Sequence, residues 1–135
     1  MYNLNAEIPE SHFEFEKFIV SYYSNGILRT QIKKDCIIGV NDLPLILEYV
    51  NALDRAPYLN LFEFHQFAST DDQIRHWASD PLGNKRTIAD AIVIHGGLDQ
   101  KILSDAYIKV HQPVKPTAIF TTIDEAVSWL LLQKS

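Results

Sequence analysis

The hydrophobic pattern of the N-terminal third predicts a β-hairpin. Residues 13–23 are rich in aromatic and β-branched side chains, which favour a strand. The run stops at Ser24-Asn25-Gly26, and an Asn-Gly pair tolerates the positive φ angles of a tight turn. Residues 27–32 then return as the partner strand. Residues 1–12 show no such period, so we expect an N-terminal arm ahead of a single domain over residues 13–135.

The rest of the chain alternates helical and strand patterns. Apolar residues recur at helical spacing over residues 43–55, 71–78, 98–110 and 123–131, and short apolar runs cover residues 59–64, 88–95 and 118–120. Thr70 with Gln73, and Thr122 with Glu125, have the spacing of a capping box and mark two helix starts. Residues 80–84 are expected to form a loop. This order predicts an α/β fold in which helices pack on a mixed, mostly parallel sheet.

Composition and charge exclude several classes of protein. The 135 residues carry a formal net charge of −5, which argues against non-specific nucleic-acid binding. No apolar run approaches the roughly 18 residues of a membrane span, and the N-terminus lacks the basic start and apolar core of a secretory signal. Cys36 is the single cysteine, which suits a reducing compartment. We therefore expect a cytoplasmic domain that binds no nucleic acid and does not insert stably into a membrane.

Residues that could act in catalysis or bind a metal do not form a known sequence motif. No two histidines have the i, i+4 spacing of a helical zinc site, and neither a nucleophile elbow nor a glycine-rich phosphate loop is present. We therefore expect no metal, no other cofactor and no enzymatic activity. An enzyme would need Glu63, His65 and His76 to meet in one charged cleft.

Two short segments are nevertheless candidates for binding. Glu63 interrupts an apolar strand, and a buried carboxylate needs a partner, so we expect it at an exposed end of the sheet. With His65 and Gln66 it forms a candidate partner-binding loop. Gly96 and Gly97 lie between a strand and a helix, where backbone N–H groups can hold an anion, although a tight turn explains two glycines equally simply.

Part of the chain resembles a known family. The resemblance rests on residues 86–94, 101–103, 107–117, 120 and 124–130. These segments resemble small bacterial proteins of the STAS-like, anti-sigma-factor-antagonist-like (SpoIIAA-like) kind, which are related in fold to the lipid-binding Sec14 domain. The resemblance implies a SpoIIAA-like fold and a non-enzymatic regulatory role with an unknown protein partner. It also implies that Ser69 and Thr70, at the start of a helix, are phosphoacceptor candidates, while plain capping of that helix is the alternative.

Two further possibilities remain open. The Sec14-like relationship implies that a small apolar ligand could occupy a cavity, and we expect such a cavity to be lined by Phe62, Trp77, Tyr107 and Trp129. The aromatic hairpin has a possible exposed edge, through which a homodimer could form.

Overall fold

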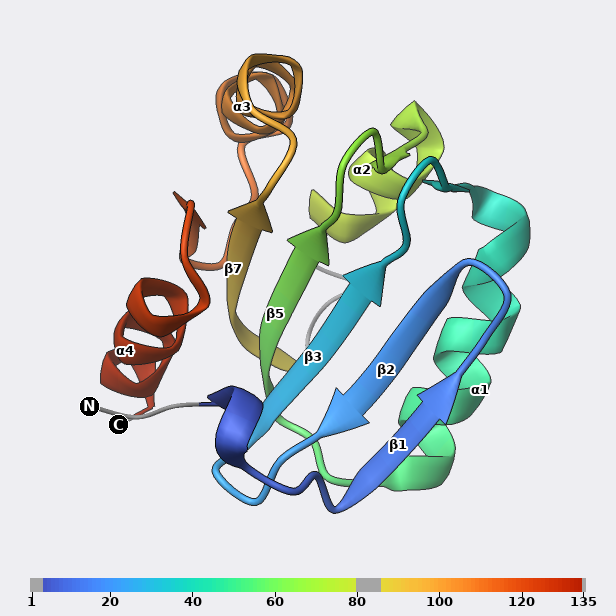
Figure 1. The fold of residues 1–135 in the computed structure, drawn as a ribbon, viewed down its shortest axis with the longest axis vertical. Helices are drawn as coiled ribbons and strands as arrows, with labels where there is room; N and C mark the ends of the chain where they lie inside the picture. The colour runs from blue at the N-terminus through green and yellow to red at the C-terminus, as the bar shows by residue number, and fades with distance from the viewer. Residues whose placement is uncertain (1–3, 80–85, 135) are drawn as a thin grey trace.

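The core of the fold is a six-stranded sheet with helices on both faces (Figure 1). A computed structural model describes residues 4–79 and 86–134, so the predicted loop over residues 80–84 lies outside the described residues. The strand order is β1-β2-β3-β5-β7-β8. The strands are β1 (Ser11–Glu14), β2 (Phe18–Tyr22), β3 (Ile27–Ile32), β5 (Tyr58–Phe64), β7 (Thr87–Ile94) and β8 (Thr117–Phe120). The pairs β1·β2 and β2·β3 are antiparallel and the other three are parallel, which confirms the predicted fold class.

Four α-helices follow the predicted segments. They are α1 (Leu43–Leu53), α2 (Asp72–Ser79), α3 (Leu98–Ala106) and α4 (Ile123–Gln133). Shorter elements are the 3-10 turns η1 (Leu4–Ala6) and η2 (Val40–Asp42), the π-helical turn η3 (Tyr107–His111), and a separate parallel pair, β4 (Ile37–Ile38) with β6 (Ser69–Thr70). Within the described ranges, no helix combines the length and apolar character needed to cross a membrane.

The helix caps agree with the sequence at one predicted position and differ at the other. At the start of α4, Thr122 Oγ1 accepts a hydrogen bond from the Glu125 amide over 3.3 Å, as predicted. At the start of α2, Asp71 Oδ1 accepts from the Ile74 amide over 2.8 Å. The predicted capping box from Thr70 was therefore wrong by one residue, because Thr70 belongs to β6.

The N-terminal aromatic run forms two strands rather than one. It folds back at residues 15–17, so that Glu14 pairs with Ile19 across β1 and β2, and the ring of Phe15 stacks on that of Phe18. The predicted turn at Asn25-Gly26 is confirmed, with Gly26 at φ +94° between β2 and β3. The predicted arm contributes Leu4 to the core, and its boundary after residue 12 falls inside β1.

Alternation along the strands gives the sheet two different faces. One face packs against α4, whose predicted inward residues Ala126, Val127 and Leu130 are fully buried. The strand residues on that face are Ile27, Leu59, Leu61, Ala89, Ala91 and Val93. The opposite face carries Val20, Leu28 and Ile32 toward α1 and α2. Adjacent residues along a strand, such as Ile27 and Leu28, therefore belong to separate halves of the core.

Two of the helices bury less apolar surface than their patterns predict. No residue of α1 is buried. In the predicted inward stripe of residues 98–110, Leu98, Ile102, Leu103 and Val110 are exposed, and Tyr107 is the member that is buried. That prediction was wrong because α3 extends beyond the end of β7 instead of lying flat on the sheet (Figure 1).

Candidate functional site

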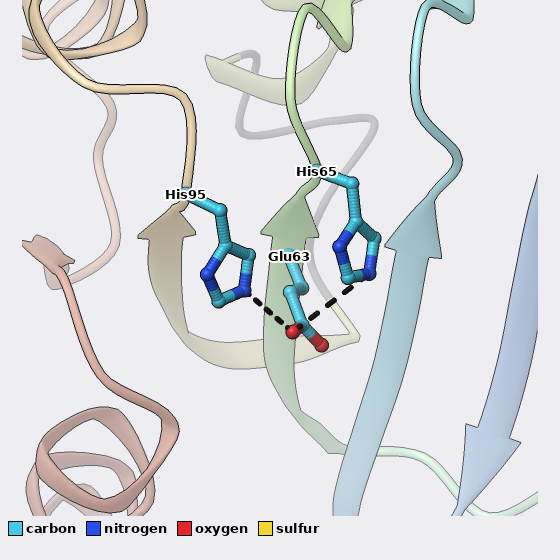
Figure 2. A group of neighbouring side chains, drawn as sticks. All are labelled: Glu63, His65 and His95. Carbon is cyan, nitrogen blue, oxygen red and sulfur yellow. Dashed lines mark hydrogen bonds and ion pairs between the residues drawn. The ribbon is translucent and has the colours of Figure 1, made fainter.

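The carboxyl ends of two neighbouring parallel strands bring Glu63, His65 and His95 together (Figure 2). Glu63 lies in β5, His65 directly follows that strand and His95 directly follows β7. Because β5 and β7 run parallel with Glu63 opposite Val93, both strands end at the same edge. Glu63 Oε2 lies 2.7 Å from His95 Nε2 and 3.9 Å from His65 Nε2. The sequence pointed to Glu63 and His65 here, but not to His95.

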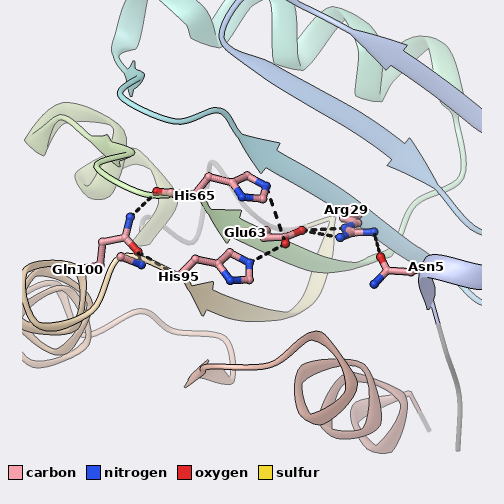
Figure 3. A network of polar contacts seen from close by, with 7 residues as sticks. Asn5, Arg29, Glu63, His65, His95 and Gln100 are labelled. Atoms are coloured by element: carbon pink, nitrogen blue, oxygen red, sulfur yellow. Dashed lines mark hydrogen bonds and ion pairs between the residues drawn. The ribbon is translucent and has the colours of Figure 1, made fainter.

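Glu63 is buried and paired with an arginine. Its exposed fraction is 3%, so the prediction of an exposed position at the end of the sheet was wrong. Arg29, from β3, donates to Glu63 Oε1 from Nε over 2.9 Å and from Nη2 over 2.7 Å. Its third nitrogen, Nη1, donates to Asn5 Oδ1 over 3.0 Å, which ties the N-terminal turn to the cluster (Figure 3). The partner that a buried carboxylate requires is thus supplied by a neighbouring strand.

The two histidines cover this buried pair and remain partly open to solvent. Their rings stack with centroids 5.1 Å apart and planes 13° apart. The two imidazoles also line a shallow surface depression together with Ile19, Lys33, Lys34 and Gln66. Of the predicted partner-binding loop, His65 and Gln66 therefore face an open surface, while Glu63 lies beneath them.

Gln100 fixes the backbone on either side of the cluster. Its carbonyl oxygen accepts hydrogen bonds from the amides of His95, over 3.1 Å, and Gly96, over 2.7 Å. Its amide nitrogen donates to the carbonyl of His65 over 2.6 Å (Figure 3) and to that of Ala68 over 3.0 Å. A Cβ at Gly96 would lie 2.6 Å from Gln100 Cδ, so a larger residue there would have to displace the Gln100 amide from its hydrogen bonds.

This contact bears on the predicted anion site at Gly96 and Gly97. The Gly96 amide is bonded to Gln100 within the chain, and an anion there would have to displace that carbonyl oxygen. The structure therefore uses Gly96 as part of a tight turn.

The phosphoacceptor candidates lie in a strand. Ser69 pairs with Ile37 in the small β4·β6 sheet, and Thr70 Oγ1 accepts from Arg75 Nη1 over 3.1 Å. The prediction that they sit at a helix start was wrong, because Asp71 caps α2 and separates them from it. Their phosphorylation stays a prediction.

His76 is not part of the Glu63 cluster. It lies on α2 beside His111 of η3, with ring centroids 6.0 Å apart, and His111 Nε2 lies 3.3 Å from Asp72 Oδ1. The enzymatic alternative required Glu63, His65 and His76 in one cleft, and the fold instead places His95 beside the first two.

The opposite face of the sheet borders a cavity of about 320 Å³. Thr30, Asn60, Phe62, Asp90 and Ile92 line it from the strands, and Leu43, Ile46, Leu47 and Val50 line it from α1. Among the residues predicted for such a cavity, Phe62, Trp77 and Tyr107 do line it. Trp129 does not, because it belongs to α4 and packs against Phe120 on the other face of the sheet.

The cavity wall includes buried polar groups. Asp90 Oδ2 lies 3.0 Å from Lys115 Nζ, and Asp90 Oδ1 accepts from Asn60 Nδ2 over 3.1 Å. Burial raises the pKa of Asp90, and the charge of Lys115 opposes that rise. The Tyr107 hydroxyl is buried and has no hydrogen-bond partner within residues 4–79 and 86–134. Burial, reinforced by the nearby Asp90, raises the pKa of Tyr107, so this hydroxyl stays a neutral donor.

Comparison with known families identifies the kind of domain. Residues 21–134 match a family described as a domain of unknown function, DUF7793. The chain belongs to this family. No curated protein and no solved structure matches it. The match runs from β2 to just past the end of α4, so it includes Glu63, His65 and His95 and all of the cavity lining except Phe18 and Val20.

Besides His95, three residues of this DUF7793 domain escaped the sequence analysis: Arg29, Asp90 and Gln100. Arg29 interrupts the apolar strand β3 much as Glu63 interrupts β5, and opposite charges in two buried strands are a usable signal for a pair. Asp90 gives the same signal within β7. Gln100 gives no such signal, because a glutamine on a helix is usually exposed.

Proposed function

We propose that this DUF7793 domain is a non-enzymatic binding module that holds a small, mostly apolar molecule in the cavity behind the sheet. The observation that carries the proposal is the position of α1. Its residues Leu43, Ile46, Leu47 and Val50 share one face, and none of them is fully buried, because all four border the cavity. Leu43, Ile46 and Val50 make only partial contact with the apolar cluster on this face of the sheet. Apolar surface gains free energy when it leaves water, so a ligand that fills the space is stabilised there.

The size and polarity of the cavity narrow the class of ligand. A volume of about 320 Å³ lies at the small end of ligand pockets, which span roughly 300–1,000 Å³. The Tyr107 hydroxyl has no partner among the described residues, so it offers one hydrogen bond to an acceptor atom of a ligand. Because the Asp90 carboxyl lies close to Tyr107, a neutral acceptor such as a ketone, ester or ether oxygen fits better than a carboxylate.

Two adjacent residues of α1 provide a matched test. Ile46→Trp places a large ring in the cavity, while Leu45→Trp adds the same ring at an exposed position that does not line it. The neutral fluorescent probe phenylnaphthylamine should bind the unsubstituted chain and Leu45→Trp, and bind Ile46→Trp at least about tenfold more weakly. Native mass spectrometry of the purified protein would show any retained ligand. Equal probe binding by both variants would contradict the proposal.

A regulatory protein-interaction module of the STAS-like type is the second candidate. It is supported by apolar side chains gathered where β5 and β7 end: Phe67 is 62% exposed and Leu98 is 72% exposed. Gln100 of α3 joins these two segments through Ala68. An unknown protein partner would contact this surface, with His65 and Gln66 beside it and Ser69 and Thr70 as regulatory positions. The resemblance to STAS-like proteins stays a prediction.

Site-specific photo-crosslinking in cells would separate this candidate from the first. A photoreactive residue in place of Phe67 should capture one defined protein, whereas the same residue in place of Leu132, exposed on α4, should not. Equal capture from both positions would argue against a specific partner surface. A third probe in place of Phe13, exposed on the edge strand β1, tests the predicted homodimer, which requires cross-links between two copies of the chain.

A further inference from the structure

We infer that Glu63, His65 and His95 bind one divalent transition-metal ion at the carboxyl edge of the sheet. These side chains lie on the α4 face, whereas the proposed ligand cavity lies on the other face, so the inference does not depend on that proposal. Each residue offers one ligand atom, and the three atoms lie within 4.8 Å of one another. Two imidazole nitrogens and one carboxylate oxygen are ligands that suit Zn²⁺, Co²⁺ or Ni²⁺ better than Mg²⁺ or Ca²⁺.

The distances need only a small adjustment. Zinc bonds of about 2.0–2.2 Å in tetrahedral geometry place neighbouring ligand atoms about 3.3 Å apart. From Glu63 Oε2, the present distances are 2.7 Å to His95 Nε2 and 3.9 Å to His65 Nε2, which bracket that value. Both histidine side chains are more than a third exposed, so their rings can turn without repacking the core.

The charges around Glu63 leave one of its oxygens for an ion. Both hydrogen bonds from Arg29 go to Oε1, and Oε2 faces the two imidazoles (Figure 2). Two lysines border the same depression and could repel a cation. Lys33 Nζ lies 2.6 Å from Glu14 Oε2, so the Glu14 carboxylate offsets the positive charge of Lys33, and Lys34 is exposed to water. The remaining coordination positions of the ion would face the depression beside Gln66, where water or an anionic group completes the shell.

Gln100 holds the backbone of both histidine ligands. It accepts from the His95 amide and donates to the His65 carbonyl, so the two loops are linked before any ion arrives. Groups that orient metal ligands typically contribute 10–100-fold to affinity. Gln100 itself is buried, which is consistent with a positioning role.

The experiment uses the full chain without an affinity tag, after dialysis against a chelator. Co²⁺ should produce visible ligand-field absorption, and Zn²⁺ should bind with a stoichiometry of one in calorimetry. His65→Gln and His95→Gln should each weaken Zn²⁺ binding at least about tenfold and remove the Co²⁺ bands. The matched control is the double variant His76→Gln/His111→Gln, which changes the other histidine pair and should leave both signals intact.

Several outcomes would overturn the inference. These are absence of Zn²⁺ binding by the unsubstituted chain, unchanged binding in both His65→Gln and His95→Gln, or loss of binding in the control variant alone. Circular dichroism of each variant confirms that it is folded. Ile46→Trp should bind Zn²⁺ normally, so failure of the cavity proposal and failure of the metal site give different results.

Discussion

Arg29 gives two hydrogen bonds to a single oxygen of Glu63, over 2.9 and 2.7 Å, and both side chains are buried within the sheet. The pair joins β3 to β5 at the place where both strands would otherwise carry apolar residues. It neutralises two charges that would be costly to bury separately. It also turns the second carboxylate oxygen toward His65 and His95, so one ion pair determines how the candidate site is arranged.

The first prediction concerns this buried pair. Glu63→Ala should lower the free energy of unfolding by about 3–5 kcal/mol, because it leaves the Arg29 charge buried without its partner. The double variant Arg29→Met/Glu63→Met should recover most of that loss. Urea unfolding followed by circular dichroism measures both effects.

The exposed pair of Lys33 and Glu14 is the control for that experiment. The Nζ–Oε2 distance in this pair is 2.6 Å, yet Glu14→Ala should lower the free energy of unfolding far less than Glu63→Ala does, because Glu14 remains hydrated. Similar losses for Glu63→Ala and Glu14→Ala would show that burial does not determine the strength of the Arg29 pair.

The second prediction compares two buried tyrosine hydroxyls. Tyr58 donates to the Val50 carbonyl over 3.0 Å, so Tyr58→Phe should lower the free energy of unfolding by about 1 kcal/mol. The Tyr107 hydroxyl has no partner within the described residues. Tyr107→Phe should therefore leave the stability of the ligand-free chain unchanged or raise it by up to about 1 kcal/mol. A clear loss on Tyr107→Phe would mean that this hydroxyl is satisfied in solution.

The third prediction is a pH dependence centred on Asp90. Burial raises the pKa of this carboxyl above its usual 3.8, and Lys115→Met removes the cation that opposes the rise. The folded variant then holds the proton to higher pH than the unfolded chain does. This contribution is fully present below pH 3.8 and is lost as pH rises through the raised pKa of Asp90.

Urea unfolding at several pH values checks this sign. Relative to the unsubstituted chain, Lys115→Met should lose stability progressively as the pH rises from about 4 through the raised pKa of Asp90. The double variant Asp90→Asn/Lys115→Met lacks the titrating group and should show no such added slope. A slope of the opposite sign in Lys115→Met would contradict the assignment to Asp90.

The fourth prediction concerns the cap of α2. Asp71 Oδ1 accepts from the Ile74 amide, so Asp71→Ala should cost about 1 kcal/mol of unfolding free energy. Gln73 was predicted to complete a capping box with Thr70, but the cap lies at Asp71. Gln73→Ala should therefore change stability by less than about 0.5 kcal/mol. Thermal or urea unfolding that ranks these variants in reverse would restore the predicted box.

Local patterns predicted most elements of the fold, for reasons visible in particular residues. Asn25-Gly26 correctly predicted the tight turn between β2 and β3, and Thr122 with Glu125 correctly predicted the start of α4. The fold-back at residues 15–17 was missed because aromatic residues favour strands on both sides of it. The exposed stripe of α3 was missed because periodicity gives the apolar face of a helix but not what that face meets.

The candidate site was harder to predict from the sequence than the secondary structure was. Glu63 and His65 were noted as a loop, but His95 joins them from 30 residues away because β5 and β7 are parallel neighbours. The Sec14-like relationship implied a cavity, and Phe62, Trp77 and Tyr107, which were expected to line it, do so. Trp129 was placed there too, and the structure shows it on the opposite face.

The sequence by itself therefore determined the α/β class, the order of most strands and helices, and the alternation of side chains along the central strands, because these depend on contacts a few residues apart. The tertiary structure alone decided that Arg29 meets Glu63, that His65 and His95 stack, and that α1 borders a cavity. Those relationships depend on which strands become neighbours and how closely helices approach them. That choice depends on the free energy of the whole packed chain rather than on any local segment.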